Sequence, residues 1–156
     1  MSVDPQWLDD QEQAAWRRLV GVMTALPAAL DSQLQRESGL THFEYWVLSA
    51  LSETPDRTLR MGCLAGMANG SLSRLSHVAG RLERRGLLER RPDPADGRFT
   101  LATLTGTGWE VVAAAAPGHV RAVRRLVFDA LTPEQTTLLA EVGDRVLRTV
   151  EAERSP

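Results

Sequence analysis

Apolar residues recur every three or four positions along much of this chain, a spacing that predicts helices with one apolar face. The first stripe spans residues 8–37, and its members are Trp16, Leu19, Met23, Leu26, Leu30 and Leu34. Pro27 lies inside this stripe and predicts a kink, because proline removes one backbone hydrogen bond of the helix. Gly39 is a typical residue to end a helix, so a long N-terminal helix is expected.

Three short helices and a hairpin are expected in the middle of the chain. The helices are predicted at residues 42–53, 60–68 and 72–85. Thr41 and Glu44 form a capping box before the first, and Asn69-Gly70-Ser71 supplies a turn and an N-cap between the other two. Two strand-like runs follow at 87–91 and 98–104, and a loop of turn residues at 92–97 joins them.

Two further helices are expected at the C-terminal end. The first covers about 107–130 and is interrupted at Pro117-Gly118. The second opens at Thr132, with Pro133 in the first helical position and Gln135 completing a capping box, and it runs to about residue 153. Its apolar stripe consists of Leu138, Leu139, Val142, Val146 and Val150.

The distribution of charge along the chain says more about its binding partner than the overall composition does. A chain of 156 residues with 43 % hydrophobic residues fits one compact domain, and its net charge of −2 argues against a nucleic-acid partner. Residues 57–98, however, hold nine arginines against four acidic residues, a local balance of +5, while the remainder carries nine against sixteen. A basic segment between acidic ends is the electrostatic pattern of a protein that binds a polyanion.

Within the basic segment the element order is that of a winged helix-turn-helix, in which one helix enters the major groove of DNA and the hairpin contacts the backbone or minor groove. Helix 72–85 places Leu75, Val78, Ala79 and Leu82 on one stripe and the polar residues on the opposite arc. The candidate DNA-binding residues are Ser71, Ser73, Arg74, His77, Arg81, Arg84, Arg90, Arg91, Asp96 and Arg98. Two alternatives remain: a solvated charged face, and a winged helix used only for protein contacts.

Other classes of function find little support. The three histidines lie far apart with no cysteine at zinc-ligand spacing, and no phosphate loop or nucleophile elbow occurs, so we expect no metal, no cofactor and no enzyme activity. A single cysteine and the lack of a long apolar run favour the cytoplasm and exclude a membrane partner. Met61, Leu64 and Met67 surround Cys63 in the sequence and favour a buried, inert thiol over a redox switch.

The sequence resembles the MarR (multiple-antibiotic-resistance regulator) family. The matching pieces are Leu64-Ala65, Arg81-Leu82-Glu83, Gly86-Leu87, Glu89-Arg90, Asp96-Gly97-Arg98 and Leu104-Thr105 followed by Gly108. The resemblance implies a mainly helical single domain over 1–156, with dimerisation helices at 8–38 and 106–153 and a DNA-binding lobe with a two-stranded wing at 41–105. It further implies a homodimeric repressor, with Arg98 at the wing tip and Asp96 orienting the wing. Leu72 and His77 depart from the commoner family pattern, so the operator sequence does not transfer.

The resemblance also implies a small aromatic or anionic effector that releases the repressor from DNA. Six residues on the two helices that would line such a cavity are candidates: Trp16, Arg17, Met23, His42, Tyr45 and Trp46. An aromatic stripe at helical spacing is also the pattern of an ordinary core, and Arg17 could equally form a surface ion pair. The sequence therefore predicts a DNA-binding transcription regulator, with an effector site as the less direct inference.

Overall fold

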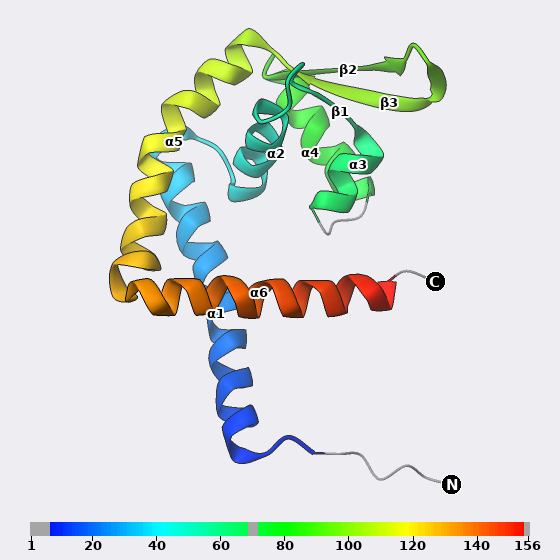
Figure 1. The fold of residues 1–156 in the computed structure, drawn as a ribbon. Coiled ribbons are helices and arrows are strands. Elements are labelled where there is room, and N and C mark those ends of the chain that lie inside the picture. Colours follow the sequence, from blue (N-terminus) through cyan, green and yellow to red (C-terminus); the bar gives the residue numbers. More distant parts are fainter. Residues whose placement is uncertain (1–6, 69–71, 155–156) are drawn as a thin grey trace, which may run out of the picture. The chain divides into compact units, whose positions relative to one another are not determined.

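The structure is a computed structural model that describes residues 7–68 and 72–154 (Figure 1). The chain divides into two compact units, Met1–His119 and Val120–Pro156. The fold is mainly helical with one small antiparallel sheet, as predicted. Within the described ranges, no helix is both long and apolar enough to cross a membrane.

Helix α1 spans Asp10–Ser38 and is defined at both ends by its own sequence. Asp9 caps the first turn, and Glu12 returns a hydrogen bond to the Asp9 backbone, a capping box that the sequence analysis did not identify. Gly39 adopts the left-handed conformation with a φ of 63°, which confirms it as the residue that ends the helix. Pro27 lies inside α1.

Helices α2 (His42–Ser52), α3 (Met61–Met67) and α4 (Leu72–Arg84) follow, close to their predicted positions. The capping box before α2 is confirmed, because the Thr41 hydroxyl accepts from Glu44 N and the Glu44 carboxylate accepts from Thr41 N. The predicted turn at 69–71, with its N-cap at Ser71, lies outside the described residues.

The sheet has three strands rather than the two predicted. Strands β1 (Thr58–Arg60), β2 (Leu88–Asp93) and β3 (Asp96–Leu104) lie in the order β1-β3-β2, and both pairings are antiparallel. The sequence missed β1 because three residues are too few to show an alternating pattern. In Figure 1 the β2–β3 hairpin extends beyond the helices of its unit.

The turn of the hairpin is shorter than predicted. Asp93 pairs with Asp96, so only Pro94 and Ala95 stand between the strands, in place of the six-residue loop 92–97. The longer loop was predicted because Pro92 is a typical turn residue. In the structure Pro92 lies within β2, which is an edge strand, where proline is tolerated. Arg98, expected at the wing tip, lies in β3 two residues after its start.

One apolar core joins the elements of the first unit. Its fully buried leucines come from the end of α1, from the connection between α1 and α2, from α2, α3 and α4, and from β2: Leu34, Leu40, Leu48, Leu51, Leu64, Leu75, Leu82 and Leu88. Burying each of these side chains contributes about 1.5–3 kcal/mol to folding. The core therefore fixes α4 against α2 and the sheet.

Helix α5 spans Gly106–Leu126 without a break, which corrects the predicted interruption at Pro117-Gly118. A Cβ at Gly118 would collide with the Glu37 carboxylate, so this glycine permits a close approach to α1 rather than ending the helix. A 3₁₀ turn at Phe128–Ala130 follows. Helix α6, Pro133–Arg154, begins with the predicted capping box between Thr132 and Gln135.

Candidate nucleic-acid interface

Helix α4 presents a polar arc to solvent, opposite the stripe that enters the core. Leu75, Val78, Ala79 and Leu82 are buried, as the periodicity predicts. Ser73, Arg74, His77 and Arg84 are exposed and therefore able to meet a ligand. Ser71, the remaining candidate on this side, lies outside the described residues.

Arg81 belongs to the same arc but is partly committed to the protein interior. Its Nε donates to Glu44 Oε1 at 3.2 Å, and Arg85 Nη1 lies 3.6 Å from Glu44 Oε2. Glu44 is only 5 % exposed and also accepts from Thr41 N, so its carboxylate ties α4 to the start of α2. Its two arginines compensate for the cost of burying this charge. Arg81 thus holds the helix in place, and its predicted contact with DNA stays a prediction.

Arg74 packs on an aromatic platform built by α2. Its Cζ lies 4.7 Å from the centre of the Phe43 ring, within range of a cation–π interaction. Phe43 is stacked in turn on Trp46, with ring centres 5.9 Å apart and planes only 6° from parallel. Trp46 is among the residues predicted from the sequence and Phe43 is not, although an aromatic pair three residues apart on a helix is a usable signal.

The base of the wing is held to α4 by one arginine. Arg90 Nε and Nη2 donate to Glu83 Oε2 at 3.0 and 2.7 Å, and the Arg90 backbone N donates to Glu83 Oε1. The hydrogen bond from the Arg90 side chain is the main reason why the pKa of Glu83 is lowered. Arg90 therefore has an internal partner, whereas Arg91 next to it is exposed.

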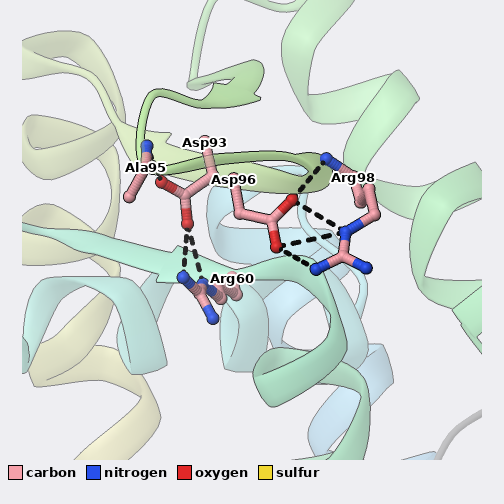
Figure 2. A network of polar contacts seen from close by, with 5 residues as sticks. All are labelled: Arg60, Asp93, Ala95, Asp96 and Arg98. Atoms are coloured by element: carbon pink, nitrogen blue, oxygen red, sulfur yellow. Dashed lines mark hydrogen bonds and ion pairs between the residues drawn. The ribbon is translucent and has the colours of Figure 1, made fainter.

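Two aspartates organise the wing tip (Figure 2). Asp93 accepts from Ala95 N and from Arg60 Nε and Nη2 at 2.7–2.9 Å, which joins β1 to the turn. Asp96 accepts from the backbone N, Nε and Nη2 of Arg98. The Ala95 amide chiefly lowers the pKa of Asp93, and the Arg98 guanidinium that of Asp96. The side chain of Arg98 remains 85 % exposed, so Asp96 directs it without burying it.

The candidate effector residues do not gather in one place. An open groove of about 490 Å³ is lined by His42, Trp46 and Arg74, together with Pro27, Ala28, Asp31, Phe43, Met67 and Ala68. A second groove of about 600 Å³ continues past Phe43 and Arg74 to His77 and Arg81. Arg74 and Phe43 therefore line both grooves.

The other candidates lie elsewhere in the same unit. Trp16, Arg17 and Met23 are exposed on the N-terminal half of α1 and are absent from the lining of either groove. Tyr45 is buried, and its ring centre lies 4.5 Å from that of His119. The role of these four residues in effector binding stays a prediction.

The prediction that Cys63 is buried was wrong. Its side chain is exposed on α3, because Met61 and Leu64 face the core while Gly62, Cys63 and Met67 face outward. Among the residues that the structure describes, no group of three or more His, Cys, Asp or Glu side chains could hold a metal ion.

Comparison with known proteins places this arrangement among known regulators. A family model described as MarR family matches residues 38–98. The HTH-type transcriptional regulator YdcH of Bacillus subtilis is 30 % identical over 118 residues, which are 74 % of this chain and 73 % of the relative. The MarR family transcriptional regulator Sco3205 of Streptomyces coelicolor, crystallised with DNA, is 46 % identical over 93 % of this chain and 91 % of its own, with a TM-score of 0.89.

The chain belongs to the MarR family. AbsC, another MarR family regulator of Streptomyces coelicolor, superposes with the same TM-score of 0.89 at 37 % identity, over 95 % of this chain and 99 % of its own. This MarR family protein is a DNA-binding transcription regulator and not an enzyme. The resemblance seen in the sequence is therefore confirmed, and the winged helix is not a module for protein contacts alone.

Proposed function

We propose that this protein is a cytoplasmic repressor that binds a pseudo-palindromic operator as a homodimer. The observation that carries the proposal is the pairing of an exposed polar arc on α4 with an exposed arginine on the wing. Arg74 and His77 stand one turn apart on that arc, so they reach base edges when α4 enters the major groove. Arg98 reaches phosphate or the minor groove, where sequence information is sparse.

The experiment separates the two roles by salt titration on two duplexes. One is selected from a random pool by the wild-type protein, and the other is its scrambled version. Arg74→Ala should reduce the preference for the selected duplex by about 1–3 kcal/mol, because one bidentate arginine–guanine contact is lost. Arg98→Ala should weaken binding to both duplexes and flatten the salt dependence by about one unit.

Arg148→Ala is the matched control, because Arg148 is an exposed arginine of α6 outside the basic segment 57–98. This variant should bind like the wild type. If Arg74→Ala keeps the full preference for the selected duplex, α4 is not the reading helix and the proposal for Arg74 fails.

We also propose that a small aromatic anion releases the protein from its operator. The groove of about 490 Å³ supports this, because it combines the Phe43 and Trp46 rings with a cation, Arg74, that belongs to the reading arc. A carboxylate that pairs with Arg74 would compete with DNA for the same guanidinium.

Benzoate titration tests the effector proposal. It should quench tryptophan fluorescence and release a labelled operator with one shared apparent affinity, because coupling between two sites is reciprocal. Trp46→Phe should lose most of the quenching, whereas Trp109→Phe, outside the groove, should keep it. Quenching without release of DNA would contradict the proposal.

A further inference from the structure

Phe43 stands where the reading helix meets the rest of the protein. Its ring lies 4.7 Å from Arg74 Cζ on one side and is stacked on Trp46 at 5.9 Å. Phe43 and Arg74 both belong to the linings of the two grooves. The three side chains thus form a short stack from α2 to the exposed arc of α4.

The position of the Phe43 ring is fixed from several sides. The Thr41–Glu44 capping box orders the first turn of α2, in which Phe43 lies. The neighbouring His42 N donates to Asp31 Oδ1 at 2.8 Å, which ties the same turn to α1. Phe43 and Trp46 are partly buried and pack against the apolar core. The ring is therefore a rigid platform, in contrast to the long flexible side chain of Arg74.

A guanidinium uses different parts of itself for stacking and for hydrogen bonding. Its flat face interacts with an aromatic ring, while its N–H donors point outward in its own plane. Stacking on a ring therefore does not use these N–H donors, which are the groups that pair with the O6 and N7 acceptors of guanine. Because the side chain is already ordered, less conformational entropy is lost when DNA binds.

We propose that Phe43 is a positioning residue for sequence reading, which holds Arg74 in the orientation that contacts a base. The inference rests on the proposed function, in which Arg74 reads the major groove. Phe43 itself contacts no DNA in this scheme. It determines how strongly the protein prefers its operator over other DNA, and has little influence on the phosphate contacts that give non-specific binding.

The test compares selectivity, the ratio of affinities for the selected and scrambled duplexes, among variants of the full chain. Phe43→Leu should lower selectivity about two- to fivefold for each Arg74 side chain that contacts the duplex. This is the range expected for the loss of one exposed cation–π contact. Its affinity for scrambled DNA and its salt slope should stay at the wild-type values. Phe43→Tyr keeps the ring and should keep the selectivity.

A double variant separates positioning from general damage to the fold. In Phe43→Leu/Arg74→Ala the selectivity should equal that of Arg74→Ala alone, because Phe43 acts only through Arg74. Trp109→Leu is the matched control: the Trp109 ring carries a similar contact with Arg57, at 4.3 Å, but on α5, and its loss should leave selectivity unchanged.

The outcomes separate the reading role proposed for Arg74 from the positioning role proposed for Phe43. If Arg74→Ala keeps its selectivity, the proposed reading role fails and the inference fails with it. If Arg74→Ala loses selectivity while Phe43→Leu keeps it, only the inference on Phe43 is overturned. If Phe43→Leu is unstable to heat, Phe43→Tyr and Phe43→Met decide, since the inference requires the first to retain selectivity and the second to lose it.

Discussion

Several arginines of the basic segment link different elements through acidic partners. Arg60, Arg81 and Arg90 donate to Asp93, Glu44 and Glu83, and these pairs join the wing to β1, α4 to α2 and the wing to α4. Arg74 and Arg98 are exposed, and each contacts a neighbour: Arg74 contacts the Phe43 ring and Arg98 the Asp96 carboxylate. The positive charge therefore helps to assemble the lobe, and in the proposed function it also contacts DNA.

Two histidines of the first unit lie close together and are partly buried. The rings of His42 and His119 lie 5.9 Å apart, and among the described residues His119 Nδ1 is buried without a hydrogen-bond partner. Burial is the main cause that lowers the pKa of both. The Asp31 charge opposes this effect at His42, whereas the charge on His42 lowers the pKa of His119 further.

We expect the free energy of unfolding to be highest above pH 6.5, the ordinary histidine value, and to fall as the pH drops toward the lower folded-state values. In that window the unfolded chain binds more protons than the folded one, so acid favours unfolding. Urea denaturation at pH 7.5 and 5.5 measures this difference, and His119→Phe should reduce it. An unchanged difference in that variant would show that this pair does not set the pH dependence. Glu83, Asp93 and Asp96 have lowered pKa values, so their protonation affects stability only below pH 4.5. They do not contribute to the difference between pH 7.5 and 5.5.

Among the secondary-structure elements, the features that could be predicted from the sequence are those set by neighbouring residues. The capping boxes at Thr41–Glu44 and Thr132–Gln135 and the left-handed Gly39 were all predicted, because each depends on residues only a few positions apart. Strand β1 and the unbroken α5 were not, since both depend on packing between distant segments. The same holds for the site: the exposed arc of α4 follows from periodicity, but the Phe43–Arg74 contact requires the tertiary fold.

The junction between the wing and α5 has no room for a side chain at Gly108. Gly108 N donates to Thr105 Oγ1, which donates to Gly86 O, and a Cβ at Gly108 would collide with the Leu87 carbonyl oxygen. Gly108→Ala should therefore lower the free energy of unfolding by about 1–3 kcal/mol, the usual cost of overpacking.

Gly106→Ala is the matched control in the same helix turn. No atom lies within 4 Å of a Cβ built at Gly106, so this change should be neutral or stabilising by up to about 1 kcal/mol. Urea denaturation of the two variants and the wild type makes the comparison. Equal stability of both variants would mean that α5 does not approach Leu87 as closely as the structure shows.

Helices α1 and α6 each carry large apolar side chains that are exposed. On α1 the exposed residues include Trp16, Leu19 and Met23, and on α6 they are Leu138, Leu139, Val142, Val146, Leu147 and Val150, each at least 44 % exposed. Periodicity predicted these stripes correctly, but it could not tell whether they pack within the chain or against another one. Contiguous apolar surface of this kind marks an interface, and the proposed homodimer is the partner that the helix-turn-helix requires to read two half-sites.

A charge placed on the α6 stripe should prevent dimer formation. Light scattering after size exclusion should give twice 17.1 kDa for the wild type at micromolar concentration and a lower mass for Val142→Glu, because the carboxylate would lose its water in an apolar interface. Thr137→Glu adds the same charge to the opposite arc of α6 and should remain dimeric. Loss of the dimer should also weaken operator binding, since the two half-sites would then be bound separately. A wild-type protein that elutes as a monomer while still binding its operator tightly would refute the proposed homodimer.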